Sequence, residues 1–150
     1  MTTGTTCDNF ITITNKLQRV LNAAARVVSG TRKFDRGLLT VRHSELHWLD
    51  VPEWIDYKLG VMVYGCQHGK SPQYLADFCT SVSDLAARQR LRSASRHQLV
   101  IPRFRLSTYG RRAFVASPSV WNSLPVEFRD PDISIGSFRR SLKTWLFSVD

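Results

Sequence analysis

The chain has 150 residues, of which 43% are hydrophobic and 11% aromatic, and its formal net charge at pH 7 is +9. This composition is too apolar for a disordered chain, and no apolar run approaches the roughly 20 residues needed to span a bilayer. The first residues, MTTGTTCDNF, have neither the basic nor the apolar region of a secretory signal. We therefore expect a single intracellular domain over 1–150, nuclear or cytoplasmic, without a membrane partner.

The first predicted element is an amphipathic helix between Thr14 and Gly30. Apolar residues recur there at the spacing of one helix face: Leu17, Val20, Leu21, Ala24, Val27 and Val28. Thr14 can cap this helix and Gly30 can end it, whereas residues 1–13 are expected to be disordered. The segment 31–43 starts polar and turns apolar, which predicts a loop and then a short helix to about Leu46.

A second long helix is predicted to start after Asp50. Asp50 is placed to cap it, with Pro52 in the first turn and Glu53 as the reciprocal half of a capping box. Its apolar face consists of Ile55, Leu59, Met62, Val63 and Cys66. Gly69 ends this helix before a shorter one that runs to about Phe78.

The sequence ASPSVWNSLP, residues 116–125, sets a tryptophan between two prolines. Ser117 and Pro118 favour the start of a helical turn, and Pro125 ends it after Leu124. A short helix with proline at both ends holds the indole of Trp121 in one place, so we interpret Trp121 as a packing anchor. Base stacking is the alternative, but the neighbouring positions are apolar where a nucleic-acid site would carry Arg or Lys.

The terminal helix is predicted to begin after Ser134, which is a good N-cap residue. Its apolar side runs through Phe138, Leu142, Trp145 and Leu146, and its opposite side carries Arg139, Arg140 and Lys143.

Together these elements predict a mainly α fold, a small helical domain of about five or six helices. In it, 14–79 forms a helical half, 80–112 an Arg-rich connection, and 113–150 the Trp-anchored turn and the terminal helix. The stretch VIPRFRL alternates like a strand, but Pro102 would remove a ladder hydrogen bond. At most one short β-hairpin is therefore expected.

The positive charge is concentrated in segment 85–112, which holds eight arginines and no acidic residue. A chain that is basic for solubility alone scatters its charge, whereas clustered guanidinium groups suit contact with phosphates. We predict that this segment contacts the phosphate backbone of RNA or DNA without sequence specificity. The predicted contact residues are Arg88, Arg90, Arg92, Arg96, Arg103, Arg105, Arg111 and Arg112. A solvated basic surface, or arginines paired with carboxylates elsewhere, is the alternative.

The sequence offers little for catalysis or metal binding. His43 and His47 with Cys66, His68 and Cys79 suggest a zinc site, but their spacing is not that of a finger or knuckle. Three widely spaced cysteines, Cys7 among them, instead favour reduced, mostly buried thiols. No Gly-x-Ser-x-Gly elbow or Gly-rich phosphate loop occurs. We expect no catalytic residue, no metal, no cofactor and no small-molecule substrate.

Several phrases of the sequence stand in an order that resembles a known family. They are LQRVLNAAARVVSG (17–30), LHWLDVPEWIDYKLGVMVYGCQHGKSPQYLADF (46–78), RLRSA (90–94), VIPRFRLSTYGRRAFVASPSVWNSLPVEFR (100–129) and SFRRSLKTWLF (137–147). This order is similar to the C-terminal end of the reverse-transcriptase reading frame of non-LTR retrotransposons, in jockey-like and chicken-repeat-like LINE elements. The resemblance covers roughly residues 16–147.

The resemblance implies a position after the polymerase palm, at the end of the thumb and beyond, in an RNA-directed DNA polymerase. A palm needs neighbouring carboxylates that hold two Mg²⁺ ions. The nearest approach here, Asp130-Pro-Asp132, has a proline in its middle and no second acidic strand. The chain is therefore expected to be a non-catalytic fragment whose partners are nucleic acid and, alternatively, a polymerase thumb or a second copy. A decayed relic without function is a further alternative.

Overall fold

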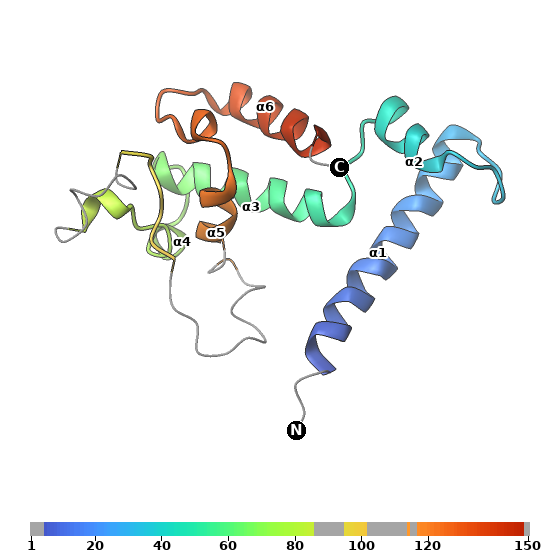
Figure 1. Cartoon of the computed structure of the whole chain (residues 1–150), viewed down its shortest axis with the longest axis horizontal. Helices are drawn as coiled ribbons and strands as arrows, with labels where there is room; N and C mark the ends of the chain where they lie inside the picture. Colours follow the sequence, from blue (N-terminus) through green and yellow to red (C-terminus); the bar gives the residue numbers. More distant parts are fainter. Residues whose placement is uncertain (1–4, 86–94, 102–113, 115–116, 149–150) are drawn as a thin grey trace. The chain divides into compact units, whose positions relative to one another are not determined.

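The computed structural model describes residues 5–85, 95–101, 114 and 117–148, with side chains from residue 12 onward. The α-helices are α1 (Thr5–Ser29), α2 (Leu38–Thr40), α3 (Val51–Gln67), α4 (Gln73–Ala76), α5 (Ser117–Ser123) and α6 (Ile135–Ser148) (Figure 1). Further helical segments are the π-helical η1 (Val41–Glu45) and the 3₁₀-helical η2 (Val82–Asp84) and η4 (Val126–Arg129). The predicted mainly α class is confirmed.

The chain divides into two compact units. Unit 1 comprises Met1–Ile55 and Leu146–Asp150, and unit 2 comprises Asp56–Trp145. In the described part of the chain, no helix combines the length and the apolar character that a membrane crossing requires.

In unit 1, α1 is longer than predicted and turns a different side inward. It begins at Thr5 and not at the predicted cap Thr14, because neither glycine nor proline interrupts the sequence between Gly4 and Gly30. It ends where predicted, at Gly30, whose φ of 68° suits a residue without a side chain. The predicted apolar stripe is largely exposed: Leu17, Val20, Val27 and Val28 are between 51% and 82% exposed.

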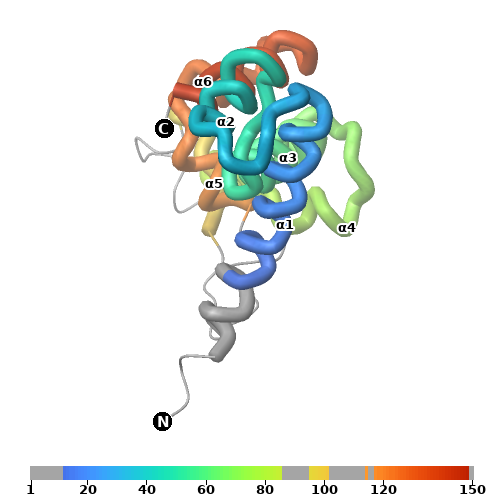
Figure 2. Tube along the Cα trace, turned by 90° about the vertical axis from the view of Figure 1, so that its right-hand side faces the viewer, coloured from blue at the N-terminus to red at the C-terminus, as the bar shows by residue number. Residues whose placement is uncertain are grey.

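The inward side of α1 is its more polar one. Ala25 is fully buried, and Gln18 and Asn22, which share a face with it, bind residues beyond the helix. The short helix α2 and the turn η1 pack against α1 (Figure 2). The predicted short helix is confirmed: after Gly37, α2 continues directly into η1, and the last turns of this helical stretch, capped by Leu46, are π-helical.

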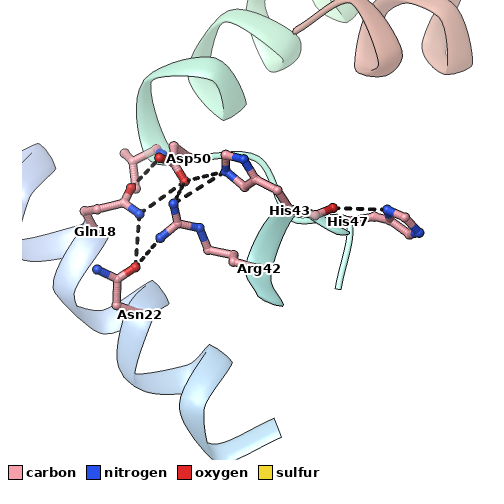
Figure 3. A network of polar contacts seen from close by, with 7 residues as sticks. Gln18, Asn22, Arg42, His43, His47 and Asp50 are labelled. Atoms are coloured by element: carbon pink, nitrogen blue, oxygen red, sulfur yellow. Dashed lines mark hydrogen bonds and ion pairs between the residues drawn. The ribbon is translucent and has the colours of Figure 1, made fainter. Parts of the chain in front are cut away.

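A polar network joins α1, η1 and the start of α3 within unit 1 (Figure 3). The buried guanidinium of Arg42 forms an ion pair with Asp50 and a hydrogen bond with Asn22. His43 Nε2 lies 3.3 Å from the Asp50 carboxylate, and Gln18 Nε2 donates to it at 3.4 Å. Asp50 is thus held by three partners from outside α3.

Asp50 takes the predicted N-cap position of α3, because its carbonyl accepts the amide of Trp54 at 2.8 Å, but its side chain does not cap the helix. The Asp50 carboxylate faces Arg42 and not the amides of α3, and the amide of Val51 donates to Gln18 Oε1 at 2.9 Å. Among the described residues, Glu53 Oε2 has no hydrogen-bond partner, so the capping box does not form. Gln18 of α1 therefore accepts the hydrogen bond from a first-turn amide of α3, the role that the sequence predicted for the Asp50 side chain.

In unit 2, α3 and α6 pack antiparallel and form the core. Near the end of α3, the Tyr64 ring stacks on Phe138 near the start of α6, with centroids 4.7 Å apart. Earlier in α3, Gly60 lies against Leu142, further along α6. Phe138 and Leu142 are fully buried, and the outer side of α6 exposes Arg139 and Arg140, as its sequence predicts.

Trp121 on α5 confirms its predicted role as a packing anchor. The residue is 3% exposed, its ring centroid lies 5.9 Å from that of Phe138, and its Nε1 donates to the carbonyl of His97 at 3.1 Å. Next to it, Asn122 pairs with the backbone of Leu99: it accepts the amide proton and donates to the carbonyl, both at 2.8 Å. The side-chain amide of Asn122 thus makes the pair of backbone hydrogen bonds that a neighbouring β-strand would make.

The rest of the segment 95–101 is also pinned by backbone bonds. The amide of Val82 donates to Gln98 O, and the amide of Val100 donates to Thr80 O, both at 2.9 Å. In the described residues this pairing amounts to one isolated antiparallel bridge, Ser81 with Leu99. Pro102 and the remainder of the predicted strand lie outside the described residues.

The connection from η4 to α6 is held by the end of α3. The Tyr64 hydroxyl donates to the carbonyl of Ile133 at 2.5 Å, and His68 Nε2 lies 3.1 Å from the carbonyl of Pro131. The predicted cap of α6 is confirmed, because the hydroxyl of Ser134 accepts the amide of Ser137 at 3.2 Å.

Candidate nucleic-acid interface

The predicted arginine cluster lies mostly outside the described residues. Arg88, Arg90, Arg92, Arg103, Arg105, Arg111 and Arg112 belong to segments that the structure does not describe, as do Phe104 and Tyr109. Arg96 is described and is exposed. The structure therefore does not test whether the eight arginines form one surface, and the cluster stays a prediction.

Arg96 is presented by a well-anchored piece of backbone. Directly after it, His97 adopts a left-handed φ of 51° and receives the Trp121 indole proton on its carbonyl. Two residues further on, Asn122 fixes Leu99, which is 2% exposed. A guanidinium beside such a segment loses less backbone freedom on binding than one on an unsupported loop.

A second arginine, Arg129, was missed by the sequence analysis. It ends η4 and is 5% exposed. Among the described residues, its Nε and Nη1 have no hydrogen-bond partner. Burial lowers the pKa of this guanidinium, the charge of Arg96 lowers it further, and Glu127 opposes both. A buried cation without a paired acid is uncommon, because desolvation is costly.

The exposed side of α6 adds two further cations. Arg139 and Arg140 are exposed on it, and α6 contains no acidic residue. A helix side of this kind contributes to a positive potential, although exposed cations also occur simply as solvated surface. Sequence periodicity correctly placed these residues outward.

The cysteines of unit 2 are buried and chemically quiet. Cys66 and Cys79 are free and buried, as predicted, while the side chain of Cys7 is outside the described set. Burial raises the pKa of the Cys79 thiol to about 12, with the Cys66 thiol adding to the rise and the Ser117 hydroxyl opposing it. A thiol in this state is a poor nucleophile and a poor metal ligand at neutral pH.

The histidines of the zinc alternative are engaged separately. His43 lies beside Asp50 in unit 1, and His68 stacks on Tyr64 in unit 2, with centroids 3.8 Å apart. Within the described ranges no group of three or more His, Cys, Asp or Glu side chains could hold a metal ion.

No protein-family model, curated protein or solved structure matches the chain.

No sequence signal distinguishes Arg129 from the other arginines. Its significance comes from burial, which depends on how η4 packs in unit 2, for example through Phe128 against Trp145 of α6, and periodicity does not encode that arrangement. The segment VEFRDPD has no helical or strand repeat from which burial could be inferred.

Proposed function

We propose that the chain is a non-catalytic C-terminal module of a non-LTR retrotransposon reverse transcriptase, and that it holds RNA or nicked DNA by the phosphate backbone. The observation that carries the proposal is the charge distribution: eight arginines and no acid between residues 85 and 112, in a chain that is otherwise nearly balanced. The sequence phrases that resemble the retrotransposon family support the polymerase context.

Electrostatics determines how such a module binds. Arginines that contact phosphates release condensed counterions, so affinity falls steeply as salt rises. If half of the eight arginines make contact, log K against log salt has a slope of about −3 to −4. Affinity at physiological salt is then on the order of 10⁻⁴ to 10⁻⁶ M and nearly independent of base sequence.

The test is a salt series of binding to single-stranded RNA, single-stranded DNA and nicked duplex. Changing Arg88, Arg90, Arg103 and Arg105 together to Gln removes about half of the contacts, and is expected to flatten the slope by about 2 and to weaken binding at least tenfold. The matched control changes four exposed cations of unit 1, Lys16, Arg19, Lys33 and Arg36, to Gln. It alters net charge equally and is expected to affect binding much less.

Two results would count against this function. A flat salt dependence in the unmodified chain removes phosphate binding altogether. Equal loss in the two quadruple variants means that overall charge, and not the 85–112 segment, attracts the nucleic acid.

The second candidate is a protein-interaction scaffold, which the exposed side of α1 favours. Leu17, Val20, Val27 and Val28 are all more than half exposed, and clustered exposed apolar residues mark interaction surfaces more often than isolated ones do. The partner is a second copy of the chain or a polymerase thumb.

Sedimentation of the chain alone, and with a thumb fragment, separates these two scaffold partners. Changing Val20 and Val27 to Ser is expected to abolish association if α1 is the contact. If the chain sediments as a monomer and does not bind the thumb, the scaffold candidate fails.

A further inference from the structure

His68 follows the last residue of α3 and links the end of this helix to the connection 130–134, which leads into α6. Its Nδ1 lies 2.8 Å from the carbonyl oxygen of Tyr64, one turn earlier in α3. Its Nε2 lies 3.1 Å from the carbonyl oxygen of Pro131 in the connection. Both ring nitrogens therefore face oxygens that can only accept a hydrogen bond.

This geometry distinguishes the two charge states of the ring. A neutral imidazole carries one N–H, so one of its nitrogens would present a lone pair to a carbonyl oxygen within hydrogen-bond distance. The imidazolium carries a proton on each nitrogen and can donate to both carbonyls at once. The two contacts of His68 are therefore satisfied together only when the ring is protonated.

Two further features of the surroundings favour a positive charge on His68. The ring stacks on Tyr64, with centroids 3.8 Å apart and an angle of 18° between the planes, and an aromatic face attracts a cation. His68 also lies at the carboxyl end of α3, where the last carbonyls make the helix end negative and a protonated histidine is stabilising. The stack and the helix end thus act in the same direction as the two hydrogen bonds.

The ring that His68 stacks on is itself fixed in unit 2. Tyr64 also stacks on the buried Phe138, with centroids 4.7 Å apart, and its hydroxyl donates to the carbonyl of Ile133 at 2.5 Å. Tyr64 and His68, one helical turn apart, therefore bind two carbonyls that are two residues apart in the connection, those of Ile133 and Pro131. The Tyr64 contact is neutral, whereas the His68 contact depends on the charge of the ring.

The charged groups nearest in sequence do not replace the imidazole. Asp130 and Asp132 flank Pro131, and Lys70 follows His68 by two residues. Among the described residues, neither carboxylate forms an ion pair with His68, and that of Asp130 accepts the amide of Asp132 at 2.9 Å. Helix α6 contains no acidic residue. The contact between α3 and the connection therefore depends on the ring itself and not on an ion pair.

We propose that His68 is a proton-controlled clamp, which as imidazolium ties the connection 130–134 to the end of α3 and as neutral imidazole releases one of the two carbonyls. The closed state binds one proton more than the released state. The clamp is therefore complete at low pH and weakens as pH rises through the range of about 5–8 in which histidines titrate. Because Ser134 at the end of the connection caps α6, the clamp makes the start of α6 sensitive to pH. It is independent of the proposed nucleic-acid function, since no arginine of segment 85–112 takes part in it.

The experiment is NMR spectroscopy of the ¹⁵N-labelled full chain across this pH range, in which histidines titrate and carboxylates have already lost their protons. The ring-nitrogen shifts of His68 report whether one or both nitrogens carry a proton. Exchange of the amide protons of Asp132 and Ile133, corrected for its intrinsic pH dependence, reports opening of the connection. We expect the protection of these amides to fall about three- to tenfold as His68 loses its second proton, the loss of one partly solvated hydrogen bond.

His68→Gln separates the charge of the side chain from its ability to donate. Glutamine can donate to one carbonyl but does not titrate. The protection of the Asp132 and Ile133 amides should therefore stay at the level that the unmodified chain reaches at high pH, without pH dependence. The matched control is His97→Asn, which removes an exposed histidine of the same unit and keeps a residue that tolerates the left-handed φ of 51°. The control should retain the pH dependence of the unmodified chain.

Several results would overturn the clamp. Protection that stays constant across the range, or that increases with pH, contradicts its sign. A pH dependence that persists in His68→Gln, or that disappears in His97→Asn, assigns the effect to another group. If His68→Gln does not fold, the unmodified chain still decides the matter. A His68 ring that keeps one protonation state throughout the range, or that titrates without a change at Asp132 and Ile133, overturns the proposal.

Discussion

Helices α1 and α6 have similar amphipathic sequences but different surroundings. In α6, the apolar residues Phe138 and Leu142 are fully buried in unit 2 against α3 and α5. In α1, the apolar residues Val20 and Val27 are 67% and 82% exposed, and polar side chains make the contacts within unit 1. Periodicity therefore predicts a helix and its two sides, but burial of the apolar side requires a complementary surface elsewhere in the chain.

The largest expected effect tests whether the buried apolar side of α6 contributes more to the free energy of unfolding than the exposed apolar side of α1. Phe138→Ala removes a fully buried ring that contacts both Tyr64 and Trp121, and should lower the free energy of unfolding of unit 2 by about 3–5 kcal/mol. Val27→Ala in α1 removes an exposed side chain and should change stability by less than about 0.5 kcal/mol.

Both Phe138 and Val27 variants are compared by denaturant unfolding and by hydrogen exchange resolved over peptides of each unit. If Val27→Ala costs as much as a core truncation, the apolar side of α1 is covered in solution and the contrast between the helices disappears.

A second prediction concerns the polar network that takes the place of an apolar core at α1. Asp50→Asn leaves the Arg42 guanidinium, whose side chain is 4% exposed, without its carboxylate. Breaking a buried pair costs about 3–5 kcal/mol, and because the Asp50 side chain is 24% exposed we expect a smaller loss of about 2–3 kcal/mol.

Hydrogen exchange in α1 and at the start of α3 measures the effect of Asp50→Asn. Glu45→Gln, which removes an exposed carboxylate of η1, is the control and should be nearly neutral. Unaltered exchange in Asp50→Asn would show that the Arg42 network does not stabilise unit 1.

Local signals in the sequence predicted the ends of helices well. Gly30 and Gly69 adopt the left-handed φ values of 68° and 64° just after α1 and α3, because glycine reaches this region without steric cost. Ser134 caps α6. The proline-flanked turn holds Trp121 in the core. Each of these features depends on residues a few positions apart, which is the range over which sequence patterns are informative.

The features that could not be predicted depend on partners far apart in the chain. Asp50 is a good capping residue by its local sequence, but Arg42 and His43 compete for its carboxylate, and Gln18 takes over the cap. Arg129 is ordinary in sequence and becomes notable because it is buried without a paired acid. In both cases the decisive information is which charges the fold brings together, and composition does not contain it.

The third prediction concerns the buried thiols of unit 2. Burial and the Cys66 thiol raise the pKa of Cys79 to about 12 from its ordinary value of 9.0. The folded chain therefore keeps this proton between pH 9 and 12 while the unfolded chain loses it, so stability falls as pH rises through that window. The difference between the two pKa values limits this loss to at most about 4 kcal/mol, at about 1.4 kcal/mol for each pH unit.

Other groups also titrate at high pH, so the measured quantity is a difference between two proteins. The free energy of unfolding of the unmodified chain should fall more steeply above pH 9 than that of Cys79→Ala. In parallel, alkylation of Cys79 should be slow in the folded chain and fast in denaturant. Parallel pH profiles for the two proteins would mean that the Cys79 thiol is solvated.

The smallest expected effect uses two glycines, one from each helix of the α3–α6 pair, that should respond with opposite sign. A Cβ at Gly60 in α3 would lie 3.0 Å from Leu142 Cδ2, whereas a Cβ at Gly136 in α6 would meet nothing within 4 Å. Alanine favours a helix over glycine by up to about 1 kcal/mol, and overpacking a core costs about 1–3 kcal/mol. We expect Gly60→Ala to destabilise unit 2 by about 1 kcal/mol and Gly136→Ala to stabilise it by about 0.5 kcal/mol.

Thermal unfolding of the two variants measures the difference, and Gly60→Ala combined with Leu142→Val should recover part of the loss. Stabilisation by Gly60→Ala would mean that Leu142 moves aside easily and that α3 and α6 pack less tightly than the stacked rings of Tyr64 and Phe138 indicate.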